Sequence, residues 1–126
     1  MRRALVGLVV LGSTVLPIRA AAQYGPRRWT APDIALAGAF TAALWIDVAQ
    51  TRQGIARGNY SELNPFLPSN PSIGQVQTYA VLVNLSVLSA AAVVSHPWRT
   101  VLLGVATALE VITIHDNARV GLHIRF

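Results

Sequence analysis

The sequence contains no cysteine and no lysine. The absence of cysteine excludes disulfide bonds, thiolate metal sites and cysteine nucleophiles, and it leaves the redox compartment undetermined. Charge is also scarce, since charged residues make up 12% of the chain, against about 25% in a typical soluble domain. No charged side chain occurs from Leu63 to Trp98 or from Ile34 to Ile46. A helix that faces water needs a polar face, so these stretches are typical of helices in lipid.

The N-terminus has the layout of a secretory signal peptide. Arg2 and Arg3 give a positive start, an apolar run of 13 residues covers 4–16, and Pro17 ends that run. Three alanines at 20–22 then offer a cleavage site between small residues, and the run is too short to span a membrane comfortably. The alternative is an uncleaved anchor, which would add one more membrane helix. The expected division is a signal peptide at 1–22 and a single helical membrane domain at 23–126.

All ten basic residues are arginine, and the formal net charge is +5. Three of these arginines lie in the expected signal peptide, and without them seven arginines stand against five acidic residues, a balance of +2. No basic patch with interleaved aromatic residues remains. We therefore expect no nucleic-acid partner.

Three apolar segments predict three helices in the mature chain. Thr30 can cap the first helix, with Pro32 in its first turn and Asp33 near its positive end. Ser72 begins the second helix, and Gln75 three residues later completes a capping-box pattern. Helices of this length can cross a hydrocarbon core of about 30 Å at about 1.5 Å per residue. The fold class is therefore all-α, a bundle of three transmembrane helices after a signal peptide, with helices at about 31–51, 73–95 and 97–117.

Residues 58–71, between the first two helices, contain three prolines and three asparagines. This composition predicts turns and excludes a regular helix, and Gly58 is a suitable helix stop. The short link at 95–97 predicts that the second and third helices are antiparallel neighbours. Within the loop, Glu62 could reach Arg52 or Arg57, or fold back toward the end of the first helix.

Export of the N-terminus would place it on the outer side of the membrane. Arg52, Arg57, Arg119 and Arg125 then lie inside, whereas Arg27, Arg28 and Arg99 lie outside, which agrees narrowly with the positive-inside rule. Helical spans argue for the inner membrane over the outer membrane. The predicted location is the inner (cytoplasmic) membrane, as a multi-pass protein in contact with the lipid bilayer.

Polar side chains within and beside the spans are the candidate site residues. Asp47 shares one helical face with Gln50, Thr51 and Gly54, and Glu110 lies on a polar stripe of the third helix. An ionised carboxylate in hydrocarbon is costly, so Glu110 must be protonated, paired or turned inward. Candidate catalytic residues are Asp47, Glu62 and Glu110, and candidate binding residues are Gln50, Thr51, Asn64, Asn84 and Asn117.

These residues allow two interpretations. In one, Asp47 and Glu110 share a functional polar centre. In the other, which we favour, Asp47 lies at the membrane interface and Glu110 bonds Asn84 or an arginine as a packing contact. His115 and Asp116, with Glu62 and Asp47, offer ligand types that zinc accepts. No pair of histidines at ligand spacing accompanies them, so we expect no metal site and no cofactor.

Two short motifs carry a resemblance to a known family. Asp47-Val48-Ala49-Gln50-Thr51 and Glu62-Leu63-Asn64-Pro65 resemble the Asp-x-x-Gln-Thr and Glu-x-Asn-Pro pattern of an uncharacterised family of small bacterial or phage-borne helical membrane proteins. The late Asn117, Gly121 and the terminal Phe126 are similar as well, whereas Pro68 stands where that pattern has glycine. The resemblance implies a membrane architecture and no known activity.

The leading functional hypothesis is a non-enzymatic interaction or assembly component of the cell envelope, as a homo-oligomer or with other membrane subunits. Small residues allow close helix contact, and no complete catalytic constellation accompanies them. One alternative is an intramembrane carboxylate- or metal-dependent hydrolase centred on Asp47, Glu62 and Glu110, with His115 assisting. Another is an oligomeric ion- or proton-coupled transport element that uses Glu110. The small residues are Gly38, Ala39, Ala42, Ser86, Ser89 and Ala90.

Overall fold

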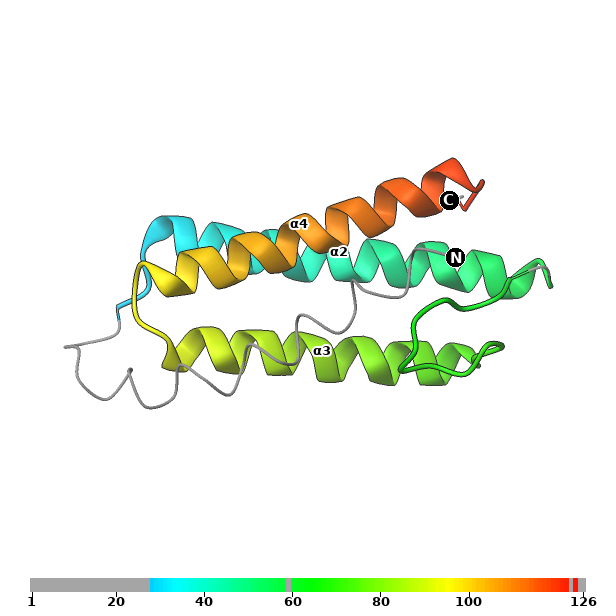
Figure 1. Ribbon diagram of the computed structural model, residues 1–126, viewed down its shortest axis with the longest axis horizontal. Coiled ribbons are helices and arrows are strands. Elements are labelled where there is room, and N and C mark those ends of the chain that lie inside the picture. Colours follow the sequence, from blue (N-terminus) through cyan, green and yellow to red (C-terminus); the bar gives the residue numbers. More distant parts are fainter. Residues whose placement is uncertain (1–27, 59, 123, 125–126) are drawn as a thin grey trace.

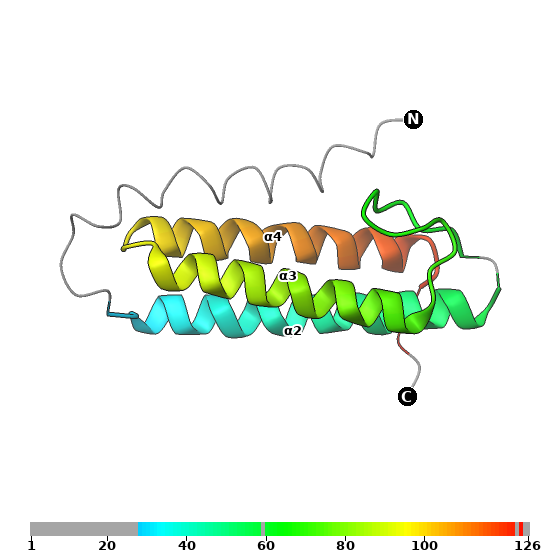
Figure 2. The same cartoon turned by 90° about the horizontal axis from the view of Figure 1, so that it is seen from below.

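A computed structural model of the chain describes residues 28–58, 60–122 and 124, so the expected signal peptide lies outside the described residues. The described part is all-α, with helices α2 (Ala31–Ala56), α3 (Ile73–Val93) and α4 (Trp98–Arg119). The helices lie side by side; α2 and α4 run in the same direction and α3 runs in the opposite one (Figure 1, Figure 2). The predicted fold class is confirmed.

Each of the three helices is long and apolar enough to cross a membrane. The 21 residues of α3 extend over about 32 Å at 1.5 Å per residue, close to the thickness of a hydrocarbon core. The 26 residues of α2 extend over about 39 Å. The last turns of α2 consequently project beyond the level at which α3 begins (Figure 1).

Local hydrogen bonds explain where α2 and α3 begin. The Thr30 hydroxyl accepts a bond from the Asp33 amide (3.3 Å), and the Asp33 carboxylate accepts one from the Thr30 amide (3.0 Å). Ser72 and Gln75 form the same reciprocal pair at 3.2 and 2.8 Å. Each capping box satisfies two amides that the first helical turn leaves free. Both predicted helix starts are confirmed.

The predicted end of the first helix at residue 51 is wrong, because α2 continues to Ala56. Residue 51 is the last residue before a charged side chain, Arg52. That point marks where the helix leaves an apolar environment, and a helix in contact with polar surroundings can continue through Arg52. The chain turns away only at Gly58, whose φ of +75° is readily adopted by glycine.

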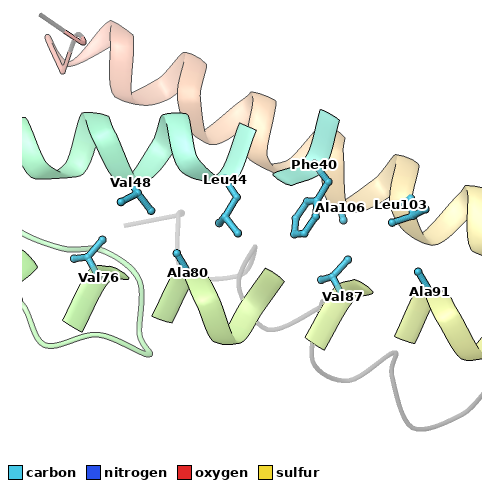
Figure 3. Close-up of a cluster of buried hydrophobic side chains, with 9 residues drawn as sticks. All are labelled: Phe40, Leu44, Val48, Val76, Ala80, Val87, Ala91, Leu103 and Ala106. Atoms are coloured by element: carbon cyan, nitrogen blue, oxygen red, sulfur yellow. The ribbon is translucent and has the colours of Figure 1, made fainter. Parts of the chain in front are cut away.

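The apolar core lies between all three helices and is centred on α2, which packs more extensively against α4 than against α3. The antiparallel arrangement of α3 and α4 matches the prediction from their short link, but these two helices have the smallest mutual contact. Many large apolar side chains point outward, Leu82 and Leu85 being 59% and 58% exposed, as expected of surfaces that face lipid. The core side chains are Phe40, Leu44 and Val48 from α2, Val76, Ala80, Val87 and Ala91 from α3, and Leu103 and Ala106 from α4 (Figure 3).

Candidate functional site

One polar stripe of α4 faces α2 along the whole bundle. The Thr100 hydroxyl donates to Asp33 Oδ1 at 2.6 Å, the Thr107 hydroxyl donates to a backbone carbonyl of α2 at 3.4 Å, and the Asn117 amide reaches Asp47. Thr100, Thr107 and Asn117 are seven and ten residues apart, about two and just under three helical turns, so they lie on one broad side of the helix. The stripe predicted from the sequence therefore forms the α2–α4 interface.

Asp47 is held by the last turns of α4. Asn117 Nδ2 donates to Asp47 Oδ1 at 2.5 Å and to Gln50 Oε1 at 3.3 Å. Gln50 Nε2 in turn donates to the carbonyl oxygen of Ile114 at 3.3 Å. Gln50 and Thr51 are buried, so the polar face predicted at this end of α2 is an interior face.

Glu62 organises the loop that joins α2 to α3. Its carboxylate accepts the backbone amides of Leu63 (2.9 Å) and Asn64 (2.8 Å) and the hydroxyl of Tyr60 (2.5 Å). The expected contact of Glu62 with Arg52 or Arg57 does not form in the described part of the chain, and Arg57 instead donates to the carbonyl of Gly121 at 2.7 Å. A carboxylate can fix a loop in this way because it accepts several hydrogen bonds at once.

The loop is fastened to both α2 and α3. The Tyr60 ring packs on Gly54, where an added Cβ would lie only 2.6 Å from the ring. Burial, the hydrogen bond to Glu62 and the nearby charges of Glu62 and Asp47 raise the pKa of the Tyr60 hydroxyl above its usual range. On the other side, the rings of Phe66 and Tyr79 stack with their centroids 6.4 Å apart. The loop thus brings Glu62 to the end of the bundle where Asp47 lies.

Glu110 lies half-buried on the inner stripe of α4, within electrostatic range of Asp47. The sequence predicts that Glu110 bonds either Asn84 or an arginine. The Asn84 side chain instead accepts the Thr41 hydroxyl at 3.1 Å and links α2 to α3, and no arginine in the described part of the chain forms an ion pair with Glu110. Within residues 28–58 and 60–122, no hydrogen bond involves the Glu110 carboxylate. The structure therefore brings the three candidate acids toward one end of the bundle. Of the three, Glu110 is the one whose carboxylate forms no hydrogen bond within the described residues.

A buried ion pair at the opposite end was missed by the sequence analysis. Arg99 and Asp33 are both 0% exposed, and Arg99 Nη1 lies 3.5 Å from Asp33 Oδ2. Arg99 also donates to the carbonyls of Ala91 (2.8 Å) and Arg28 (2.9 Å). The guanidinium lies 4.9 Å from the centre of the Trp29 ring. From the sequence, Asp33 is expected only at the start of a helix and Arg99 only on the outer side of the membrane; the signal that links them is that both stand at the starts of parallel helices.

The weak metal candidates are not assembled with other ligands. His115 is exposed on α4 and Asp116 is half-buried beside it. Within the described ranges, no group of three or more histidine, aspartate or glutamate side chains could hold a metal ion. The acids around Asp47 are instead surrounded by amide and hydroxyl groups, which suits hydrogen bonding more than metal coordination.

Comparisons of the chain with protein-family models, with curated proteins and with solved structures found no match in any of the three. The resemblance to a family of small bacterial membrane proteins thus stays a prediction. Its architectural part is shown, because the chain has three helices suited to spanning a membrane.

Proposed function

We propose that this small multi-pass membrane protein is a non-enzymatic interaction or assembly component of the cell envelope. The observation that carries the proposal is that the polar side chains in the spans mostly form hydrogen bonds with one another, inside the bundle. Asp47, Gln50 and Asn117 bond one another, and Thr41 bonds Asn84. Polar bonds of this kind hold transmembrane helices together, which leaves the outer helix faces for lipid and partner helices.

One outer face of α2 is suited to close contact with another helix. Gly38, Ala39 and Ala42 are exposed there, and a Cβ added at Gly38 would meet nothing within 4 Å. A glycine inside a helix costs about 0.5–1 kcal/mol relative to alanine, and packing within this chain does not offset that cost. A partner helix that approaches closely would offset it, so we assign this face to a second copy or to another membrane subunit.

Single cysteine substitutions test this assignment directly, because the chain has no native cysteine. We expect Gly38→Cys in native membranes to form a disulfide-linked or reagent-linked complex. Gly104→Cys on α4 is the matched control: a Cβ there also meets nothing within 4 Å, but the larger exposed side chains of Val101 and Val105 flank it and hinder close approach of a second helix. In mild detergent, Gly38→Ile should lose the complex that wild type and Gly104→Ile retain. A wild-type chain that is monomeric in both settings would refute the proposal.

We also propose that the protein lies in the inner membrane with its mature N-terminus on the outer side. Arg99 is buried and paired with Asp33, so it adds no free positive charge to the end at which α2 begins. Arg52, Arg57 and Arg119 are exposed at the other end, which supports placing that end inside. A green fluorescent protein fused to the C-terminus should fluoresce, and alkaline phosphatase fused there should be inactive; the reverse pair of results would invert the topology.

A carboxylate-dependent hydrolase is the second candidate, supported by the gathering of Asp47, Glu62 and Glu110 toward one end of the bundle. Buried carboxylates are the groups that such chemistry requires. Asp47→Asn and Glu110→Gln preserve size and remove charge. If both variants accumulate and assemble normally yet abolish a cellular phenotype of the gene, this candidate replaces the assembly role. A transport element based on Glu110 would in addition require an oligomer.

A further inference from the structure

Charges at the end where α2 and α4 finish are segregated between the inside and the outside of the bundle. The acids Asp47 and Glu62 are bound by Asn117 and Tyr60, and they point into the bundle or the loop. Arg52, Arg57 and Arg119 are exposed. The only ion pair within the described residues is Arg99 with Asp33, at the opposite end. Among residues 28–58 and 60–122, no carboxylate therefore forms an ion pair with these three arginines.

The three arginines belong to one end of the molecule, at the depth of a membrane surface. Arg57 donates to the carbonyl of Gly121 at 2.7 Å, which places it beside the chain that leaves α4 just after Arg119. Arg52 lies one turn after Val48, whose side chain faces Val76 in the first turn of α3 (Figure 3), so Arg52 begins the projecting part of α2. Because α3 alone is about as long as a hydrocarbon core is thick, this projecting part reaches the headgroup layer.

Stabilisation of helix ends explains only part of this arrangement. Arginines in a last turn interact favourably with the negative helix end and with free carbonyls, and Arg57 does this with one of its N–H groups. Arg52 is more than one turn before the end of α2, so the helix end does not account for it. Asp116 is the single other acid nearby on α4, and it is half-buried. A net positive, outward-facing rim remains.

We propose that this rim, formed by Arg52, Arg57 and Arg119, binds the headgroup phosphates of anionic phospholipids. Guanidinium groups present several N–H donors in a plane and suit phosphate oxygens. Basic residues beside a membrane span attract anionic lipid, and the effect is additive and falls off within a Debye length. This inference needs the membrane position of the helices but is independent of any partner subunit.

Spin-labelled lipids in vesicles that contain the full-length protein test the proposal. We expect the protein to immobilise phosphatidylglycerol with a preference over phosphatidylcholine of roughly fivefold or more, because a single arginine–headgroup contact of about 1 kcal/mol already gives that factor. The variant Arg52→Gln/Arg57→Gln/Arg119→Gln should lose the preference. Arg28→Gln, an exposed arginine at the opposite end, should keep it. About 1 M salt, at which the Debye length is about 3 Å, should remove it.

Several results would overturn the proposal. Wild type could show equal association constants for the two lipids, or Arg28→Gln could reduce the preference as much as the triple variant does. Inorganic phosphate that displaces phosphatidylglycerol far better than chloride at equal ionic strength would assign the rim to free phosphate instead. If the triple variant does not accumulate, Arg52→Gln alone should lower the preference, because Arg52 is exposed and outside the last turn; an unchanged preference would then count against the proposal.

Discussion

At Gly54, α2, the loop and the chain after α4 lie close together. A Cβ added there would lie 2.6 Å from Cδ2 of Tyr60 and 3.0 Å from Cδ2 of Leu122. Contacts this short force neighbouring groups to move, and overpacking of this kind costs about 1–3 kcal/mol. Glycine at this position therefore allows Tyr60 and Leu122 to pack against the backbone of α2. Its backbone conformation is helical, so the position does not require the conformational freedom of glycine.

Gly54→Ala should accordingly lower the free energy of unfolding by about 1–3 kcal/mol, measured by SDS-induced unfolding in mixed micelles. Gly104→Ala is the control, because nothing lies within 4 Å of its Cβ, and it should be neutral or stabilising by up to about 1 kcal/mol. Equal effects of the two substitutions would show that the Tyr60 contact does not constrain α2.

Tyr60 makes the stability of the folded loop depend on pH in the alkaline range. Its pKa is raised in the folded chain by burial and by the hydrogen bond to Glu62, whereas the unfolded chain loses the proton near the ordinary value of 10.0. The contribution of Tyr60 to stability is thus fully present below pH 10 and falls as the pH rises above that value. Tyr60→Phe should unfold with a flatter pH dependence in this range than wild type, as followed by circular dichroism. Identical slopes would contradict the buried position of the hydroxyl.

At the level of the helices, the beginnings of α2 and α4 are joined by the ion pair of Asp33 and Arg99. Removing one partner of a buried pair leaves an uncompensated charge and costs about 3–5 kcal/mol. Asp33→Asn should therefore destabilise the protein by about that amount, and Asp33→Asn/Arg99→Met should recover part of the loss. A double-mutant cycle on unfolding in mixed micelles measures the coupling. Strictly additive effects would mean that Arg99 is held by the carbonyls of Ala91 and Arg28 alone.

The sequence predicted those features of the helices that depend on neighbouring residues. The starts at Thr30 and Ser72 follow from capping patterns that span only four residues, and the inner stripe of α4 follows from spacing along one helix. The end of α2 could not be found from hydropathy, since hydropathy reports where apolar surroundings stop. The pairing of Asp33 with Arg99, and the approach of Tyr60 to Gly54, depend on how separate helices align in space.

For the molecule as a whole, α2 is the helix that both others need. It supplies core residues to α3 through Leu44 and Val48, and it holds α4 through polar contacts at both of its ends, at Asp33 and at Asp47. The contact between α3 and α4 is smaller. Transmembrane helices associate through packing and interhelical hydrogen bonds after they have inserted. Contacts between helices, and not chain continuity through the loop, should therefore hold the bundle together.

Division of the chain between Ser69 and Asn70, two exposed loop residues, tests this view. Co-expressed fragments 1–69 and 70–126 should purify together through a tag on either one, because the first retains α2 and the second retains α3 and α4. Asn117→Leu in the second fragment removes the bonds to Asp47 and Gln50 and should reduce the recovered complex several-fold, whereas His115→Leu, exposed on the same helix, should not. Fragments that insert but never associate would show that the loop anchored by Glu62 and Tyr60 is needed to align α3 and α4 on α2.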